Sequence, residues 1–240
     1  MKQLLKRILA LLHISVTRNQ RYDAYTRQII KQTLKPDSDC IDIGCHKGEI
    51  LDLMIEGSPS GRKYGFEPIP ELFRALTEKY HNDPSVTIFP TALYDKTGVT
   101  NFQHVLNAPA YSGIKKREYD GKHVHIEQIS VKTDLLDNMI PPEANVRLIK
   151  IDVEGAEFQV IKGAKKTIQR CHPILIFEFG LGAADFYESK PEHLFQFISA
   201  ECGQKISTLK GYLKGNPPLT DSEFKICFEK STEYYFVAHN

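Results

Sequence analysis

A glycine-rich turn and an acidic residue downstream of it are the first features of the sequence that could bind a ligand. The run Asp42-Ile-Gly44-Cys45-His46-Lys47-Gly48 leaves an apolar stretch, and its two glycines stand four residues apart. Gly44 can adopt a positive φ and let a ligand approach the backbone, while Gly48 lets a helix pack closely. Glu67 follows about 20 residues later, where a Rossmann-like site binds ribose hydroxyls. Together these residues predict a nucleoside site, with turns that serve only the chain's own geometry as the alternative.

Three carboxylates at the ends of apolar runs could handle a proton. Asp152 and Glu154 close one such run, and Glu178 closes the next. A carboxylate within hydrogen-bond reach of a reacting group can act as its base. Because side chains alternate along a strand, Asp152 and Glu154 share a face if the strand continues through Glu154. The alternative is that Glu154 and Glu157 only favour a helix N-terminus by their negative charge.

The spacing of the glycines indicates which nucleoside the turn would bind. A dinucleotide site has the pattern G-x-G-x-x-G, which this turn lacks, and the sequence also lacks the G-x-x-x-x-G-K-[ST] phosphate loop. A wider turn opened by Asp42 suits a ligand that has no phosphate but carries an amino group and a carboxylate. S-adenosylmethionine is such a ligand.

Alternating strands and helices position these residues. Several predicted strands are apolar throughout, which indicates a buried parallel sheet covered by helices on both faces. The predicted fold class is α/β, a doubly wound Rossmann-like fold with a mostly parallel sheet and an antiparallel C-terminal strand. The predicted strands are Cys40–Gly44, Lys63–Glu67, Val86–Phe89, Val99–Val105, Arg147–Val153, Ile174–Phe179, Lys205–Leu209, Phe224–Phe228 and Tyr234–Ala238. The predicted helices are Gly48–Glu56, Pro70–Tyr80, Glu154–Gln169 and Pro191–Cys202, and residues 106 to 123 are predicted to form a functional loop.

Composition limits which partners and which cellular compartment we expect for the protein. The 240 residues fit one domain, and a net charge of +1 gives no reason to expect a nucleic-acid partner. The five cysteines include no C-x-x-C pair. We therefore expect them to be buried thiols of a protein in a reducing compartment, not a disulfide framework or a zinc site. We therefore expect a cytoplasmic protein.

The N-terminus forms a separate feature. Residues 1–35 are predicted to be a helical extension that precedes the domain of residues 36–240. Met1–Val16 combines basic residues with apolar ones at helical spacing, and it is too short to span a bilayer. Three interpretations stay open for it: a helix that covers one edge of the domain, a helix that contacts a membrane surface and makes the protein peripheral, or a secretory signal.

Beyond these patterns, the sequence resembles FkbM-type methyltransferases over roughly residues 38 to 180. The resemblance implies a class I methyltransferase that uses S-adenosylmethionine to methylate a hydroxyl on a sugar, a glycan or a small natural product. It is carried by Asp42–Gly48, Gly65-Phe66-Glu67-Pro68, Thr91–Gly98, Val131–Leu136, Leu148–Glu157 with its block Lys150-Ile-Asp-Val-Glu-Gly-Ala-Glu157, Val160–Ala164 and Ile174–Glu178.

The resemblance and the strand ends together assign the site. Glu154 is expected to be the base for the acceptor hydroxyl, Asp152 to position the cofactor or acceptor, and Glu178 to reach the same cleft. A non-catalytic nucleoside-binding module on the same fold is the alternative. The residues expected to bind S-adenosylmethionine are Asp42, Gly44, Cys45, His46, Gly48, Glu67, Pro68, Thr91, Ala92, Ser112 and Asp152.

Overall fold

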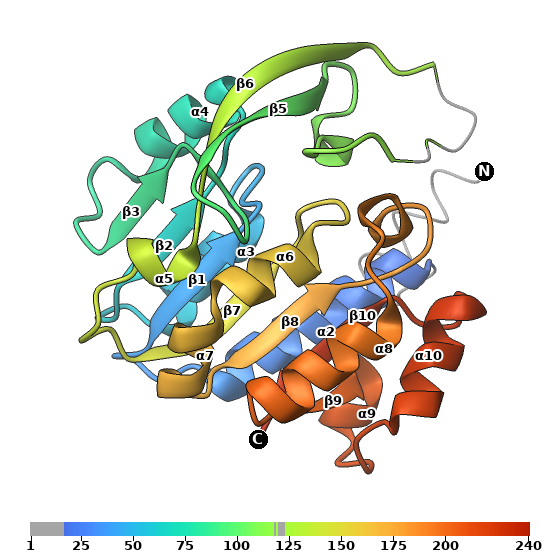
Figure 1. Cartoon of the computed structure of the whole chain (residues 1–240). Helices are drawn as coiled ribbons and strands as arrows, with labels where there is room; N and C mark the ends of the chain where they lie inside the picture. The colour runs from blue at the N-terminus through green and yellow to red at the C-terminus, as the bar shows by residue number, and fades with distance from the viewer. Residues whose placement is uncertain (1–16, 118, 120–122) are drawn as a thin grey trace, which may run out of the picture.

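A computed structural model describes residues 17–117, 119 and 123–240 of the chain (Figure 1). The helix predicted within Met1–Val16 lies outside these residues. In the described part of the chain, every helix is too short or too polar to cross a membrane.

A seven-stranded sheet forms the centre of the molecule (Figure 1). Its strand order is β3-β2-β1-β7-β8-β10-β9, and only β10 runs antiparallel to its neighbours. This confirms the predicted doubly wound α/β fold. The strands are β1 (Asp39–Ile43), β2 (Lys63–Phe66), β3 (Val86–Phe89), β7 (Val146–Ile151), β8 (Ile174–Glu178), β9 (Lys205–Thr208) and β10 (Tyr235–His239).

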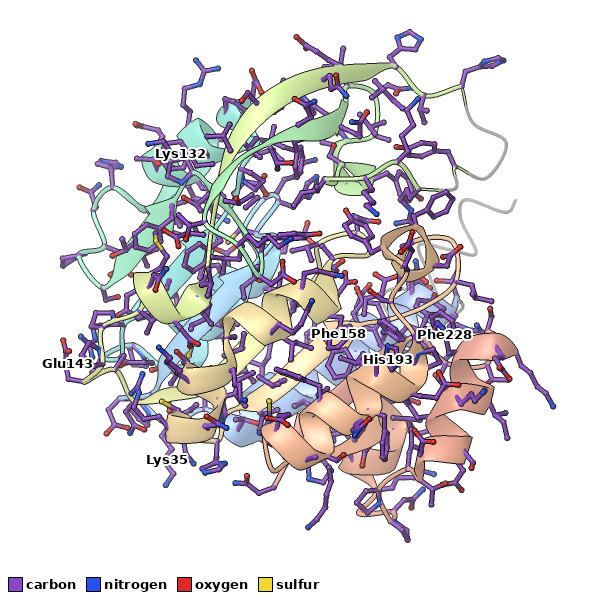
Figure 2. All side chains as sticks on the ribbon, viewed as in Figure 1. Lys35, Lys132, Glu143, Phe158, His193 and Phe228 are labelled. Atoms are coloured by element: carbon purple, nitrogen blue, oxygen red, sulfur yellow. The ribbon has the colours of Figure 1, made fainter. Side chains whose placement is uncertain are left out.

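Helices cover both faces of this sheet because its buried strands present apolar side chains to both sides. Ile41 and Ile43 face one core, which α5 to α8 and α10 complete, whereas Cys40 and Leu148 face a second core with α2, α3, α4 and α9. Figure 2 shows Phe158 and Phe228 on helices of the first face. The helices are α2 (Arg18–Thr33), α3 (Glu49–Gly57), α4 (Pro70–Tyr80), α5 (Leu136–Met139), α6 (Glu157–Gly163), α7 (Lys165–Cys171), α8 (Pro191–Gln196), α9 (Leu209–Leu213) and α10 (Asp221–Glu229).

A second sheet of three strands lies beyond the carboxyl ends of β1 and β2 (Figure 1). It consists of β4 (Thr91–Leu93), β5 (Gly98–Val105) and β6 (Ile126–Asp134) in the order β4-β6-β5. Its residues Ala92, Phe102 and Val131 form a small core with Ile69, at the turn before α4. The strand β5 was predicted; β4 and β6 were not.

Two predicted elements were wrong in type or extent. Phe224–Phe228 is not a strand but part of α10, where Phe224, Cys227 and Phe228 are buried at helical spacing. A capping box between Thr220 and Glu223 starts this helix. The helix predicted over Glu154–Gln169 begins only at Glu157 and breaks at Ala164 into α6 and α7.

Two smaller departures concern the extent of one helix and the packing of another. The helix predicted over Pro191–Cys202 is α8 followed by a π-helical turn over Phe197–Glu201. The helix α2 is not separate from the domain core, because Ile29 and Ile30 are fully buried against it. The domain boundary near residue 35 stays a prediction.

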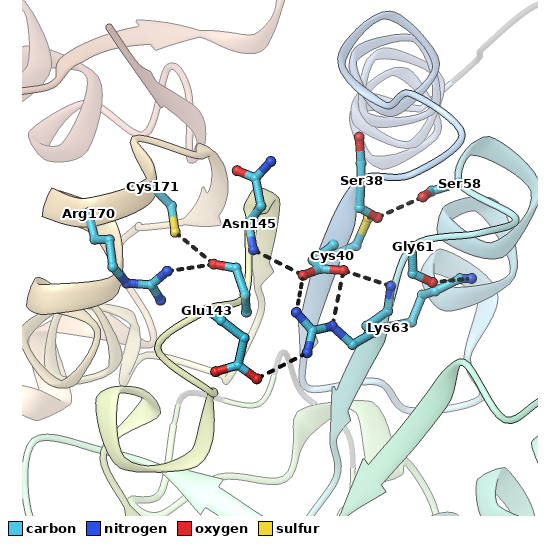
Figure 3. Close-up of polar contacts among 12 residues, drawn as sticks. Ser38, Cys40, Ser58, Gly61, Lys63, Glu143, Asn145, Arg170 and Cys171 are labelled. Atoms are coloured by element: carbon cyan, nitrogen blue, oxygen red, sulfur yellow. Dashed lines mark hydrogen bonds and ion pairs between the residues drawn. The ribbon is translucent and has the colours of Figure 1, made fainter.

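Polar contacts fix the amino edge of the sheet, on the side opposite the glycine turn (Figure 3). The Asp39 carboxylate accepts the backbone N–H groups of Arg62 (2.8 Å) and Asn145 (3.0 Å). It also pairs with the Arg62 guanidinium at 3.0 Å, and Arg62 reaches Glu143 at 3.5 Å. These contacts join β1, β2 and the segment before β7.

Candidate active site

The glycine turn brings the ends of β1 and β7 into contact. Gly44 has φ +84°, and a Cβ placed there would stand 2.0 Å from the backbone oxygen of Asp152. Only glycine fits such a left-handed and crowded position. Gly48, with φ +77°, caps α3, and a Cβ there would collide with the Tyr80 hydroxyl. Gly48 therefore serves helix packing, as the sequence predicted for its position.

Asp42 is a buried carboxylate that lacks a partner. It is 1% exposed, and neither carboxylate oxygen has a hydrogen-bond partner within the described residues. Burial raises the pKa of Asp42 to about 6, while the nearby Lys150 ammonium opposes that shift. An unsatisfied buried carboxylate is costly, so a cationic group bound in front of the glycine turn would be stabilised by the Asp42 charge behind it.

Glu67 is buried at the carboxyl end of β2, where the chain turns toward α4. Its Oε2 accepts the backbone N–H of His46 (2.9 Å), and its Oε1 accepts that of Ile69 (3.0 Å). Burial raises the pKa of Glu67 to about 7 despite these two donors. Each oxygen keeps one lone pair for a further donor, so the side chain can accept ribose hydroxyls.

A pocket extends from this turn to the small sheet, and we call it the nucleoside pocket. Its floor is mostly apolar, with Phe66, Leu72 and Phe102 among its lining residues. Eight residues predicted to bind the cofactor line it, namely Gly44, His46, Glu67, Pro68, Thr91, Ala92, Ser112 and Asp152. The Ser112 hydroxyl accepts the Val105 N–H at 2.9 Å, which holds the long loop against β5.

The remaining predicted cofactor residues lie behind or beside this pocket. Cys45 is buried, and its thiol donates to the backbone oxygen of Asp42 at 3.2 Å. It lines the adjoining hollow, together with His46 and Lys150. Asp42 and Gly48 line neither cavity.

Two hollows, a smaller and a larger one, adjoin the nucleoside pocket, and together we call them the outer cleft. Ala110, Asp152 and Glu154 line all three cavities, so these residues stand where the nucleoside pocket meets the outer cleft. Residues of α2, β8, β10 and the loop also line the outer cleft. Among them are Arg18, Tyr22, Asp23, Arg117, Glu178, Tyr234 and Tyr235.

Asp152 is the centre of a buried network at this junction. Its Oδ2 accepts hydrogen bonds from Lys150 Nζ (2.5 Å) and from the Tyr235 hydroxyl (2.6 Å). Burial alone would raise the pKa of Asp152, but the Lys150 ammonium holds it below its usual value. Asp152 therefore stays ionised.

Glu178 adjoins Asp152 and differs from it in charge. Burial, followed by repulsion from the Asp152 carboxylate, raises the pKa of Glu178 to about 8. These opposite shifts favour the proton on Glu178 and the charge on Asp152, its hydrogen-bonded neighbour.

Glu154 lines the cleft from a turn after β7, a conformation that the sequence did not predict. The strand β7 ends at Ile151, and Glu154 adopts φ +58° in a turn that Gly155 completes with φ +109°. The condition for Asp152 and Glu154 to share a strand face is therefore not met. The Glu154 carboxylate pairs with Arg117 from the loop. Glu157 is buried and holds the turn, because its Oε1 accepts the N–H groups of Val153 and Gly155.

Comparison with known proteins identifies the family to which the chain belongs. The family model described as the methyltransferase FkbM domain matches residues 42–206 of the 240. The chain belongs to the FkbM methyltransferase family. The match begins at Asp42 in the glycine turn and includes Glu67, Asp152, Glu154 and Glu178.

Two curated relatives and one solved structure illustrate the likeness. The chain is 28% identical over 161 residues to the 2-O-methyltransferase NoeI of Sinorhizobium fredii, a match over 60% of this chain and 64% of that protein. It is 30% identical over 121 residues to the hexuronic acid methyltransferase AglP of Haloferax volcanii, over 50% and 48% of the two chains. The chain thus spans about half to two thirds of the relatives' lengths.

The solved structure is a methyltransferase FkbM from Methylobacillus flagellatus KT. It superposes with a TM-score of 0.51 at 14% identity, over 89% of this chain and 50% of that chain. At that identity the superposition bears on the fold alone, and it agrees with the predicted class I architecture.

Several residues of this FkbM site escaped the sequence analysis. Lys150 had a local signal, because it precedes Asp152 by two residues on a strand and so tends to face the same side. Arg117, Tyr22 and Tyr235 had none, since they come from the loop, from α2 and from β10. Across the described segments, no group of three His, Cys, Asp or Glu side chains is placed to hold a metal ion.

Proposed function

We propose that the protein transfers a methyl group from S-adenosylmethionine to a hydroxyl group of a sugar. The observation that carries the proposal is the junction at Asp152 and Glu154, where the nucleoside pocket opens into the outer cleft. A methyl donor bound in the pocket and an acceptor bound in the cleft would meet there. The sugar is inferred from the relatives, one named a 2-O-methyltransferase and the other a hexuronic acid methyltransferase.

The chain's residues suit the parts of this cofactor. The apolar floor of the nucleoside pocket suits an adenine ring, and Glu67 would accept the ribose hydroxyls. Asp42 lines neither cavity, so it would favour the cationic methionine end only by its charge from behind the glycine turn. When bound, S-adenosylmethionine supplies an electrophilic methyl group for an in-line displacement, so the protein has mainly to align the acceptor oxygen and take its proton.

Two carboxylate groups stand where that proton is released. Glu154, the base expected from the sequence, is paired with Arg117, and a neighbouring cation lowers the basicity of a carboxylate. Asp152 lies at the same junction, but the Lys150 ammonium lowers its pKa in the same way. We therefore keep Glu154 as the proposed base for the acceptor hydroxyl and assign Asp152, with its neighbour Glu178, to positioning the cofactor or acceptor.

Calorimetric titration with S-adenosylhomocysteine tests the cofactor half of the proposal. We expect one molecule to bind per chain, and we expect NAD and ATP to show no comparable affinity, because the turn lacks their phosphate-binding pattern. Binding of NAD in place of S-adenosylhomocysteine would contradict the proposal. Binding of S-adenosylhomocysteine without any methyl transfer would instead favour a non-catalytic module.

A further inference from the structure

Three tyrosines gather on one side of the outer cleft. The ring of Tyr22 on α2 contacts the rings of Tyr234 and Tyr235 at centroid distances of 4.8 and 5.2 Å. Tyr22 and Tyr235 line both hollows of the cleft, and Tyr234 lines the larger one. Aromatic rings with a polar edge suit ligands that have both apolar and hydrogen-bonding surfaces, and a sugar ring presents C–H groups between hydroxyls.

This tyrosine cluster is held in place by contacts between α2 and the segment before β10. The Arg18 guanidinium donates to the backbone oxygen of Ser231 at 2.8 Å and lies 5.6 Å from the Tyr234 ring centroid. The Tyr234 hydroxyl donates to Asn19, and the Tyr22 hydroxyl donates to Glu233. Both segments lie outside residues 42–206, which the family model matches. This side of the cleft therefore lies outside the segment that the family model matches.

The charges of the larger hollow are unevenly balanced, because Arg18 and Arg117 line it together with four acidic residues, Asp23, Asp152, Glu154 and Glu178. In the smaller hollow the exposed Lys47 and Glu49 offset each other. The two least exposed cations of the cleft, Lys150 and Arg117, are already paired with Asp152 and Glu154. Arg18 is exposed at the rim and already contacts Ser231. Asp23, on α2, adds a further carboxylate that faces the cleft.

A carboxylate on the acceptor would meet these groups unfavourably. It would stand near Asp23 and the Asp152–Glu178 pair, and like charges repel most strongly where solvent is partly excluded. A neutral sugar would instead donate hydrogen bonds from its hydroxyls to the ionised carboxylates, Asp23 and Asp152, which act only as acceptors.

We propose that the outer cleft binds a neutral sugar ring against the Tyr22–Tyr234–Tyr235 cluster and discriminates against hexuronic acids. This inference rests on the proposed methyl transfer and names its acceptor class. Asp23 on α2 is the specificity-determining charge.

Saturation-transfer NMR on the full chain, with S-adenosylhomocysteine bound, tests this acceptor class. The probes are the methyl glycosides of glucose, galactose and mannose, each compared with its uronic acid. We expect at least one neutral glycoside to receive saturation and its uronic partner to receive less. Asp23→Lys should raise the ratio of uronic-acid saturation to neutral-glycoside saturation by about fivefold, the scale of one solvent-exposed charge interaction.

The matched control is Asp37→Lys, which changes an exposed carboxylate just before β1, at the opposite edge of the sheet. It should leave the ratio unchanged. No saturation of any sugar, equal or stronger saturation of the uronides in the unchanged protein, or a ratio that Asp23→Lys does not move would each overturn the inference. Failure of S-adenosylhomocysteine itself to bind would count against the proposed function instead.

Discussion

The hydroxyl of Tyr235, near the C-terminus, donates a hydrogen bond of 2.6 Å to Oδ2 of Asp152. Asp152 follows β7 in the middle of the sheet, and Tyr235 begins the antiparallel strand β10. The same carboxylate oxygen accepts from Lys150, so two donors hold it in one orientation. The C-terminal strand β10 therefore positions the Asp152 carboxylate at the junction of the nucleoside pocket and the outer cleft.

Removing the Tyr235 hydroxyl should slow methyl transfer. Tyr235→Phe keeps the ring but takes one donor from a buried carboxylate, so we expect turnover to fall by about tenfold or more, the scale of a hydrogen bond to a charged group. The affinity for S-adenosylhomocysteine, measured by calorimetry, should stay nearly unchanged. Tyr212→Phe on α9, away from the cavities, is the control. Equal turnover of the two variants would show that Tyr235 plays no positioning role.

The affinity for S-adenosylhomocysteine should rise with pH through about 7. Ribose hydroxyls donate to the ionised form of Glu67, and the pKa of Glu67 is raised to about 7 by burial, so protonation below that pH competes with binding. Below pH 7 the affinity should fall by up to about tenfold per pH unit. Calorimetric titrations between pH 5.5 and 8.5, the range set around this pKa, measure the effect.

Glu67→Gln should remove this pH dependence and weaken binding at pH 8. The control is Asp39→Asn, because Asp39 also accepts two backbone N–H groups but lies at the other edge of the sheet. Both variants should lose some stability, and only Glu67→Gln should lose affinity. A pH-dependent affinity that persists in Glu67→Gln would place the titrating group elsewhere.

The free energy of unfolding should decrease as pH rises from about 5 to about 8. Glu178 has a folded-state pKa raised to about 8, above the 4.5 of an exposed carboxyl, so the folded protein keeps a proton that the unfolded chain has lost. The stability associated with this group is fully present below the unfolded pKa and is lost as pH rises through the folded one. The change is on the order of 3 kcal/mol.

Urea unfolding at several pH values within this window measures that slope. Glu178→Gln should make the slope shallower, because the variant lacks this titrating group, while Asp42, Glu67 and Glu157, whose pKa values are also raised by burial, keep part of it. Glu192→Gln should not, since the pKa of the exposed Glu192 is lowered by its Lys225 partner and lies below the window. The same slope in the Glu178→Gln protein as in the unchanged one would be incompatible with a protonated Glu178.

Gly44→Ala should abolish cofactor binding and destabilise the fold. A methyl group at this position would stand 2.0 Å from the Asp152 oxygen, and the backbone is left-handed, so we expect a loss of about 3 kcal/mol. Gly203→Ala is a matched control, because Gly203 has φ +68° but no atom within 4 Å of the added methyl group. It should cost about 1 kcal/mol and leave binding intact. Comparable losses in the two variants would argue against the contact between Gly44 and Asp152.

The parts of the site that are local in sequence could be predicted from it. The glycine turn and Glu67 are separated by one strand–helix–strand unit, and the pattern of that unit fixes where both residues lie. Asp152 and Glu178 both line the outer cleft, since they stand at the carboxyl ends of neighbouring buried parallel strands, and their roles stay predictions.

The rest of the site depends on contacts between distant segments. Tyr235 reaches Asp152 only because β10 inserts beside β8, and no local pattern reports that register. The left-handed Glu154 was not predicted because its conformation depends on the buried Glu157, which accepts two backbone N–H groups of that turn. The segment around Phe224 was misread as a strand because its apolar residues are few, and the capping box at Thr220 was overlooked.

The most direct test of the account is methyl transfer from S-adenosylmethionine labelled with ¹³C in its methyl group. The purified chain is incubated with the neutral methyl glycosides, and the products are examined by NMR. We predict a new methyl ether signal on one sugar oxygen, with one S-adenosylhomocysteine released per methyl group, and no product with the Gly44→Ala protein. Bound S-adenosylhomocysteine with no methyl ether on any sugar offered, or a methyl group found on nitrogen or carbon, would contradict sugar O-methylation.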